Sequence, residues 1–265
     1  MKKLNFLASA LLLVGLTAQA QEPLRLMTYN IKNGLGMDNV CSYQRIADAI
    51  KKADPDVVAL QEVDSVTNRS NHKYVLGEIA KLTDMSAYFA PAIDFDGGKY
   101  GIGLLAKETP IRVERMALPG REEARTMILV EFDTYIYCCT HLSLTEEDRM
   151  ASLPLLRKFA KGTNKPFFLA GDFNANPYDE ELLSKYSFNA VLFKSVINKC
   201  DFTNPRSKKI KRFYNPSPAP DETIDYIVAR NLDNYEVNVK KTCVLEEPVA
   251  SDHRPILVEV TIKKK

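Results

Sequence analysis

The stretch Val57-Val-Ala-Leu-Gln-Glu62 is the part of this 265-residue chain that decides its fold. Four consecutive apolar residues, two of them β-branched, are typical of a short strand that is buried on both faces. The strand ends in Gln61 and Glu62, so it carries a carboxylate to the edge of a buried sheet. The stretch Phe167-Phe-Leu-Ala-Gly-Asp172 has the same form and predicts a second strand of this kind.

Helices and strands alternate on both sides of these two stretches. Apolar residues at helical spacing begin at Tyr43 and stop before Asp54-Pro55, and a second set runs from Leu76 to Leu82. No internal repeat or Gly/Ser linker interrupts residues 24–263, so residues 21–265 are predicted to form a single domain. Further strands are predicted at 24–31, 101–106, 111–117, 126–132, 134–140, 223–229 and 256–262, a third helix at 146–161, and an irregular proline-rich loop at 201–222.

Polar side chains stand where four of the apolar strands end: Asn30, Glu62, His141 and Asp172. Strand ends gathered along one edge of a sheet hold side chains rigidly, while the loops beside them are free to vary. Chance explains one such ending. Four in one chain, each able to bind a metal or a phosphate, predict a functional site at that edge.

The first twenty residues have the form of an export signal. Lys2 and Lys3 precede an apolar run at residues 11–16, and Ala18-Gln-Ala20 matches the small-residue pattern before a cleavage site. We therefore expect cleavage of residues 1–20 before Gln21 and a periplasmic or extracellular location. The apolar run is shorter than the roughly 20 residues that cross a bilayer, so no transmembrane segment is expected in the mature chain.

The five cysteines do not have the spacing of a metal site. There is no Cys-x-x-Cys and no His/Cys ligand pattern, which disfavours a zinc hydrolase. Cys138 and Cys139 are neighbours on a predicted strand, so they point to opposite faces and are expected to be small core residues. Cys200 and Cys243 are the pair in which a disulfide is to be sought.

The order of the short motifs resembles that of the endonuclease/exonuclease/phosphatase superfamily, which includes DNase I-like nucleases, sphingomyelinases and inositol-phosphate phosphatases. The resemblance implies an α/β fold in the form of a four-layered sandwich, with two packed mixed β-sheets flanked by helices. The matching segments are Thr28-Tyr-Asn-Ile31, Leu60-Gln-Glu-Val63, Tyr100-Gly-Ile-Gly103, Thr140-His-Leu142, Gly171-Asp-Phe-Asn-Ala175, Ile224-Asp-Tyr226 and Ser251-Asp-His-Arg-Pro255.

Glu62 is the first candidate metal ligand, because a carboxylate that closes a buried strand is costly without a cation or donor beside it. Glu62, Asn30 and Asp252 all offer oxygen, which suits Mg²⁺, with Mn²⁺ as the alternative. A surface salt bridge is the competing interpretation of Glu62, and the apolar residues 57–60 argue against it. The DNA-repair members have an acid where this chain has Lys32, so one main Mg²⁺ is expected, and Lys32 is left to meet an anionic group of the substrate.

Asp172 and Asn174, by resemblance, orient and deprotonate the attacking water. In an extended turn their side chains would point to the same side and hold one water, although Asp-x-Asn alone also forms an ordinary Asx turn. His253 is predicted to donate to a phosphate oxygen or to share in activating the water, with Asp225 holding its ring as the imidazolium. His141 is expected to stabilise charge on the non-bridging oxygens, or else to be a structural residue at the strand end.

Three residues are predicted to bind substrate. Tyr100 opens a Gly-rich segment where the chain can approach a phosphate closely, so its hydroxyl can donate to it. Arg125 is placed to clamp phosphate, but an Arg beside Glu122 and Glu123 is also commonly a surface ion pair. Asn30 joins them as a substrate contact besides its place among the metal ligands.

The predicted reaction is metal-assisted, in-line attack of water on phosphorus. Loss of Lys2 and Lys3 leaves 34 basic and 34 acidic residues, which favours a phospholipid headgroup, an inositol phosphate or another small phosphoester over nucleic acid. A secreted endo- or exonuclease is the alternative, with the basic run Arg206–Arg212 as its backbone contact. A third alternative is a non-catalytic phospholigand-binding member, and nothing in the sequence indicates an obligate protein partner.

Overall fold

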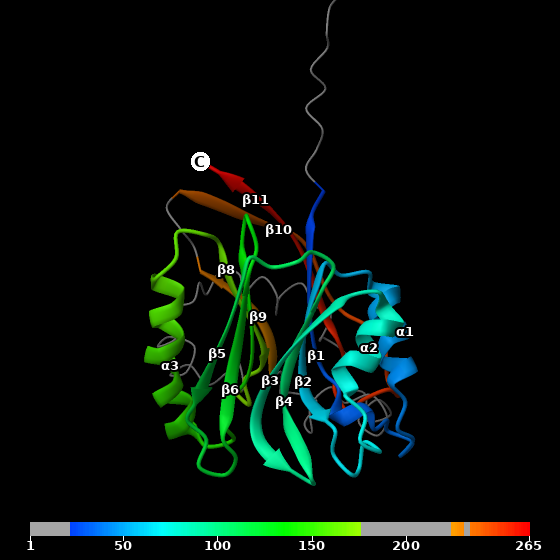
Figure 1. The fold of residues 1–265 in the computed structure, drawn as a ribbon. Helices are drawn as coiled ribbons and strands as arrows, with labels where there is room; N and C mark the ends of the chain where they lie inside the picture. The colour runs from blue at the N-terminus through cyan, green and yellow to red at the C-terminus, as the bar shows by residue number, and fades with distance from the viewer. Residues whose placement is uncertain (1–21, 176–223, 231–233) are drawn as a thin grey trace, which may run out of the picture.

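The computed structural model describes residues 22–175, 224–230 and 234–265, and the strands in these ranges form two mixed sheets (Figure 1). Within each sheet one neighbouring pair is parallel, β1 with β2 and β7 with β8, and the other pairs are antiparallel. The first sheet has the order β10 (Tyr235–Val244), β11 (Ile256–Lys264), β1 (Leu24–Asn30), β2 (Val57–Ser65), β4 (Gly98–Ala106), β3 (Ser86–Phe95), and the second β5 (Arg112–Leu118), β6 (Arg125–Glu131), β7 (Ile136–His141), β8 (Phe167–Asp172), β9 (Asp225–Arg230).

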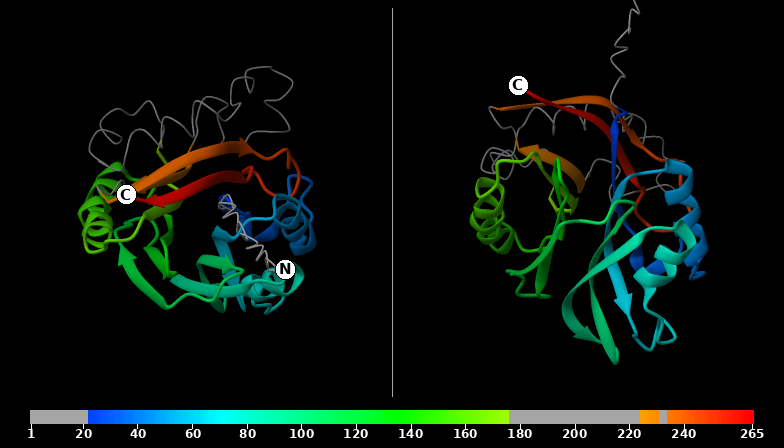
Figure 2. Two further views of the ribbon diagram at one scale, coloured as in Figure 1. Left: turned by 90° about the horizontal axis from the view of Figure 1, so that it is seen from above. Right: turned by 45° about the horizontal axis from the view of Figure 1, so that its top comes forward.

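Helices cover the outer faces of both sheets, as the two views of Figure 2 show. Helices α1 (Tyr43–Ala53) and α2 (Val75–Thr83) pack on the first sheet, and α3 (Glu146–Lys161) packs on the second. A short 3-10 turn, η1 (Lys32–Gly34), follows β1. The order helix, sheet, sheet, helix confirms the predicted four-layered α/β sandwich.

In the described ranges, alternating residues of the strands divide the interior into three apolar clusters. Leu26 on β1 faces the other sheet, whereas its neighbour Met27 faces the helices, because successive strand residues point to opposite sides. Phe168 and Tyr137 fill the space between the sheets from the other side. Burial of each such side chain contributes roughly 1.5–3 kcal/mol, so this middle layer is a main source of stability.

The ends of α1 follow from its sequence. The hydroxyl of Ser42 caps its first turn by accepting from the backbone NH of Arg45 at 3.4 Å. Asp54 takes the left-handed conformation after the last turn (φ 48°), and Pro55 cannot continue the helix. The predicted stop before Asp54-Pro55 is confirmed.

Two strands were not predicted, β3 and β10, and they form the two edges of the six-stranded sheet. Each has a single buried residue, Ala90 in β3 and Thr242 in β10, so neither shows a run of apolar residues or a clear alternation. Both also contain an irregularity in register, next to Pro91 in β3 and to Lys241 in β10. Edge strands carry a weak pattern because one side of the ladder is open to solvent.

Three predictions fall on residues outside the described ranges: the export signal at 1–20, the loop at 201–222 with its basic run, and Cys200 as the partner of Cys243. In the part of the chain that the structure describes, no helix is both long and apolar enough to cross a membrane. Cys138 and Cys139 are buried free thiols on β7, in agreement with their predicted role as core residues.

The hydroxyl of Tyr137 joins the two sheets by donating to the backbone carbonyl of Met27 at 2.8 Å in the buried layer. We expect Tyr137→Phe to lower the free energy of unfolding by about 1–2 kcal/mol, because it removes one buried hydrogen bond without changing the ring. Urea denaturation followed by circular dichroism measures this loss. The control Tyr235→Phe, on an edge strand, should change stability by less than about 0.5 kcal/mol; an equal loss in both variants would contradict the prediction.

Candidate active site

The carboxyl ends of the parallel strand pairs bring the predicted residues to one edge of the sandwich. Asn30 ends β1 and sits beside β2, and His141 and Asp172 lie opposite each other at the ends of β7 and β8. Asp225 begins β9 and pairs with Asp172 in the antiparallel ladder. His253 precedes β11, which runs antiparallel to β1, so it arrives at the same edge. Segments separated by up to 223 residues in sequence therefore meet there.

Glu62 reaches this edge through a β-bulge. Leu60 pairs with Gly103 and Val63 with Gly101, so two residues of β2 oppose one of β4. Leu60 and Val63 both face the helices, which leaves Gln61 and Glu62 to face the other sheet together. Glu62 adopts the left-handed conformation that the bulge requires (φ 58°). In a regular strand Glu62 would point toward the helices.

Gln61 stabilises the bulge through contacts with neighbouring strands of both sheets. Its amide nitrogen donates to the hydroxyl of Thr28 on β1 at 3.2 Å and lies 3.2 Å from the sulfur of Cys139 on β7. All three residues are fully buried. This polar contact between the sheets was not predicted, although Gln61 stands beside Glu62 in the same sequence motif.

Asn30 connects the carboxylates of the two sheets. Its Nδ2 donates to Glu62 Oε1 at 2.9 Å and to Asp172 Oδ2 at 3.1 Å, while its Oδ1 accepts from the backbone NH of Lys32 at 3.1 Å. The hydroxyl of Ser251 donates to the Asn30 carbonyl at 2.8 Å, which ties the loop before β11 to β1. Asn30 therefore turns its nitrogen toward the carboxylates, and its predicted roles as metal ligand and substrate contact stay predictions.

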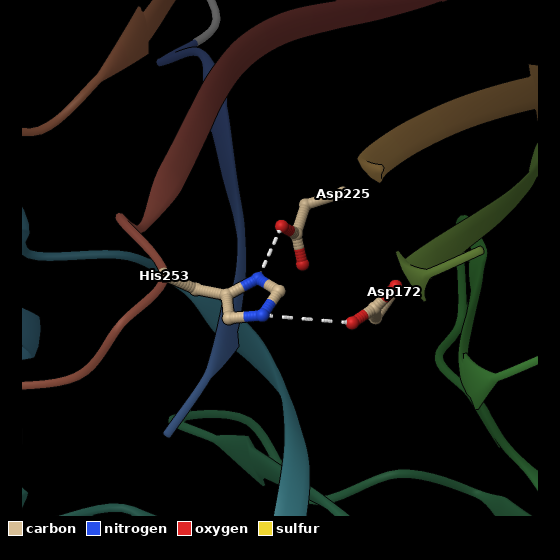
Figure 3. A group of neighbouring side chains, drawn as sticks. All are labelled: Asp172, Asp225 and His253. Atoms are coloured by element: carbon tan, nitrogen blue, oxygen red, sulfur yellow. Dashed lines mark hydrogen bonds and ion pairs between the residues drawn. The ribbon is translucent and has the colours of Figure 1, made fainter. Parts of the chain in front are cut away.

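His253 lies between two carboxylates (Figure 3). Its Nδ1 is 2.6 Å from Asp225 Oδ2, and its Nε2 is 3.8 Å from Asp172 Oδ2. Burial acts to lower the pKa of His253, but the charges of Asp225, Asp172 and Asp252 and the hydrogen bond to Asp225 raise it to about 10. The ring is thus an imidazolium at neutral pH, as predicted, and an imidazolium donates from both nitrogens and is not a metal ligand.

His141 has the opposite protonation state. Its Nε2 lies 3.7 Å from Asp172 Oδ2, yet burial lowers the pKa of His141 to about 4 despite the charge of Asp172. At neutral pH the His141 ring is therefore uncharged. It can stabilise charge on an oxygen only as a neutral hydrogen-bond donor, not as a cation.

Asn174 does not take the extended conformation that was predicted. Its φ of 47° is left-handed, and its backbone NH donates to Asp172 Oδ1 at 2.9 Å, which is an Asx turn. Its side-chain Nδ2 donates to the carbonyl of Leu142 at 2.9 Å. The prediction of two parallel side chains was wrong because the local hydrogen bond to Asp172 curls the backbone.

Asp252 is engaged in an ion pair with Lys32, whose Nζ lies 2.7 Å from Asp252 Oδ2 at the half-exposed rim of the site. Both residues were predicted to meet other groups, Asp252 a metal and Lys32 the substrate. The pair leaves Asp252 Oδ1 as the oxygen that could meet a metal, whereas the charge of Lys32 is already balanced by Asp252.

Arg125 and Tyr100 lie on neighbouring parts of the same edge. Arg125 forms ion pairs with Glu122 at 3.4 Å and Glu123 at 3.0 Å, the partners that the alternative interpretation expected. The pair does not lie on the surface, however, because Arg125 is only 6% exposed. Tyr100 is half-buried on β4. Burial, followed by the charges of Glu62 and Glu123, raises the pKa of Tyr100, which keeps its hydroxyl protonated as a donor.

The three carboxyl groups of Glu62, Asp172 and Asp225 fit a divalent cation. Burial raises the pKa of each, and as carboxylates with one imidazolium, His253, they leave a net charge of −2. Asp225 Oδ1 is buried and has no hydrogen-bond partner among the residues that the structure describes. Carboxylate oxygens of Asp172 and Asp225 lie within 4.8 Å of each other and of a ring nitrogen of His253, and with His253 as an imidazolium the available donors are the carboxylate oxygens that Mg²⁺ prefers.

Comparison with known families shows the family to which this chain belongs. The model of the Endonuclease/Exonuclease/phosphatase family matches residues 27–253, from β1 to His253. The chain belongs to the endonuclease/exonuclease/phosphatase family. The match includes every predicted site residue.

Solved structures of other proteins share this fold. The endonuclease/exonuclease/phosphatase from Bacteroides vulgatus is 17% identical, with a TM-score of 0.69 over 92% of this chain and 100% of that one. The human Nocturnin catalytic domain with bound sulfate is 20% identical (TM-score 0.62; 91% and 95% covered). The mannosyl-6-phosphatase of Bacteroides thetaiotaomicron is 20% identical (TM-score 0.61; 90% and 99% covered). At these identities the likeness shows the fold alone.

We expect Asp225→Asn to lower the pKa of His253 from about 10, because Asp225 supplies the largest of the contributions that raise it. Titration of the metal-free protein by NMR of the imidazole nitrogens measures the shift. Asp252→Asn is the matched control, with a smaller decrease, because its charge is the weakest of the three carboxylate contributions. Equal shifts in the two variants would show that Asp225 does not hold the imidazolium.

Proposed function

We propose that this family member is an exported, Mg²⁺-dependent phosphoesterase that hydrolyses a phosphodiester or phosphomonoester by in-line attack of water. The proposal rests on the group of half-buried Glu62 and buried Asp172 and Asp225 around the His253 imidazolium. Negative groups that are withdrawn from water are costly without a cation beside them. Together these residues offer a base, an acid and a site for a cation.

Glu62 is the residue that we expect to hold Mg²⁺, with Asn30 and Asp252 as further predicted ligands. The bulge gives Glu62 its direction, and Asn30 holds its Oε1 at 2.9 Å. When bound, the cation supplies Lewis-acid stabilisation of the negative charge that develops on the phosphoryl oxygens.

Asp172 is the base in this proposal. Its carboxylate is fixed by Asn30 on Oδ2 and by the Asn174 backbone on Oδ1. Burial raises the pKa of Asp172, which makes its carboxylate a stronger acceptor for the proton of the attacking water.

His253 supplies the positive donor. Asp225 fixes the orientation of its ring through Nδ1, which leaves Nε2 toward Asp172. From there the imidazolium can donate to a phosphoryl oxygen in the transition state, with neutral His141 as a second donor.

A phospholipid headgroup or a small phosphoester is the substrate that we favour. The balance of 34 basic and 34 acidic residues after removal of the signal gives no global attraction to a polyanion. The described basic residues at the site edge are also paired: Lys32 with Asp252, Arg69 with Asp64 and Arg125 with Glu123. The fold neighbour that is named a mannosyl-6-phosphatase agrees with a small substrate.

Glu62→Gln tests the proposal. We expect it to weaken Mg²⁺ binding, measured by isothermal titration calorimetry, and to lower kcat at least about 100-fold, because a ligand carboxylate is lost. Hydrolysis of bis(p-nitrophenyl) phosphate and p-nitrophenyl phosphate by the protein beginning at Gln21, with and without EDTA, separates diesterase from monoesterase activity.

Glu78→Gln, which removes a carboxylate from the outer helix α2, is the matched control and should retain full activity. Nicking of supercoiled plasmid by the wild type, lost in Glu62→Gln, would favour the secreted nuclease instead. Equal activity of Glu62→Gln and wild type at saturating Mg²⁺ would contradict the assigned role of Glu62.

A further inference from the structure

We propose that Arg69 is a positioning residue: Asp64 holds its guanidinium against the ring of Tyr100, and this fixes the point at which the Tyr100 hydroxyl meets a substrate phosphate. The inference rests on the proposed function, because it needs a phosphate group bound at the site. Arg69 lies in the turn after β2, seven residues beyond Glu62, and none of the predicted roles includes it.

The guanidinium of Arg69 is fixed by a bidentate ion pair. Its Nε donates to Asp64 Oδ2 at 2.7 Å and its Nη2 to Asp64 Oδ1 at 2.8 Å. Asp64 is 1% exposed and also accepts from the hydroxyl of Thr67 at 2.9 Å. A two-point contact with a buried carboxylate sets both the position and the plane of the guanidinium.

The backbone around Arg69 is held as well. Its NH donates to Asp96 Oδ2 at 2.7 Å, and the NH of Asn68 donates to the Asp96 carbonyl at 2.8 Å. Asp96 belongs to the turn between β3 and β4, so the loop after β2 is attached to the hairpin that carries Tyr100. Side chain and backbone are thus constrained from two directions.

The fixed guanidinium lies over two aromatic rings. Its central carbon is 4.5 Å from the ring centroid of Phe95 and 5.5 Å from that of Tyr100, and the two rings are 5.9 Å apart. A planar cation over an aromatic face is attractive and restricts the tilt of the ring. The Tyr100 ring is therefore in contact with both the fixed guanidinium and the Phe95 ring.

Tyr100 faces the site. It lies opposite Asp64 in the β2–β4 ladder, and directly opposed residues share a face of the sheet. That face is the one toward which the bulge turns Glu62, and the Glu62 charge acts on the hydroxyl of Tyr100. Within the described ranges this hydroxyl has no hydrogen-bond partner in the protein, so it is available to donate to a ligand.

A purely structural role is the competing explanation, since the Asp64–Arg69 pair also ties the loop to β2. The two explanations differ in what Tyr100 contributes. If Arg69 acts by holding Tyr100, its removal matters only while the Tyr100 hydroxyl is present. If the pair only stabilises the fold, the effects of the two residues are independent.

Binding of inorganic phosphate in the presence of Mg²⁺, measured by calorimetry, tests the proposal with wild type, Tyr100→Phe, Arg69→Gln and the double variant. We expect Tyr100→Phe to raise Kd about 10-fold, the loss of one hydrogen bond to a charged group. Arg69→Gln should raise Kd about 3- to 10-fold and add less than about 2-fold in the Tyr100→Phe background. Additive losses, or no change in Arg69→Gln, would overturn the proposal.

Three further variants protect the test against a folding defect. Asp64→Asn with Arg69→Gln removes both charges together, so no buried carboxylate is left unpaired, and it should bind phosphate as weakly as Arg69→Gln. Arg69→Lys keeps the charge without the planar face and should not restore binding; full restoration would refute positioning through the ring. Arg112→Gln, an exposed ion-paired arginine on β5, is the matched control and should bind as wild type.

Hydrolysis measured on the same proteins separates the two proposals. The positioning role predicts a higher KM with a smaller change in kcat for Arg69→Gln. A wild type that binds phosphate but hydrolyses no phosphoester would reject the proposed function and leave the binding cycle as the test of Arg69. A wild type that binds no phosphate would reject both.

Discussion

Three carboxyl groups meet at the junction of two packed sheets, those of Asp172 and Asp225 buried and that of Glu62 half-buried, and the other features of the site depend on this cluster of negative charge. Glu62, Asp172 and Asp225 come from β2, β8 and β9, and burial raises the pKa of each. Uncompensated, such a cluster would cost several kcal/mol of stability. The protein supplies one cation of its own, the His253 imidazolium, and the remaining negative charge is what a divalent metal ion would neutralise.

A β-bulge and a few side-chain hydrogen bonds keep these groups close together. The bulge in β2 turns Glu62 from the helix side to the inner side of the sheet, and Gln61 holds that bulge on Thr28 and Cys139. Asn30 then donates to Glu62 and Asp172, one carboxylate from each sheet. The packing of the two sheets and the geometry of the site are therefore coupled, and a shift of one sheet against the other would separate the carboxylates.

The sequence predicted the parts of the site that strong local patterns carry. The apolar stretches before Glu62 and Asp172 were visible because both strands are buried on two faces, and the ordered motifs linked them to Asp225 and His253. The predicted end of the first strand at Glu62 was wrong, because β2 continues through its bulge to Ser65. The bulge was not visible, because register depends on the partner strand β4 and not on the residues of β2 alone. For the same reason the pairing of Lys32 with Asp252, from segments 220 positions apart, could not be foreseen.

Sequence patterns did not predict the structure where residues are exposed to solvent or where a local hydrogen bond sets the backbone conformation. The edge strands β3 and β10 have few buried residues, and Asn174 follows the Asx turn to Asp172 instead of an extended path. Arg69 was overlooked because its partner Asp64 follows the recognised motif by one residue, and an Asp and an Arg five residues apart in a strand and turn carry no distinctive spacing.

We infer that the carboxylates at the sheet junction hold a divalent cation. Anomalous diffraction from crystals soaked in MnCl₂ tests it most directly, because the manganese signal locates the ion without assumptions about activity. We expect a peak in contact with the Glu62 carboxylate, on the side that faces Asp172, and no such peak in Glu62→Gln. A site without manganese in the wild type, or with manganese bound only on the surface, would contradict it.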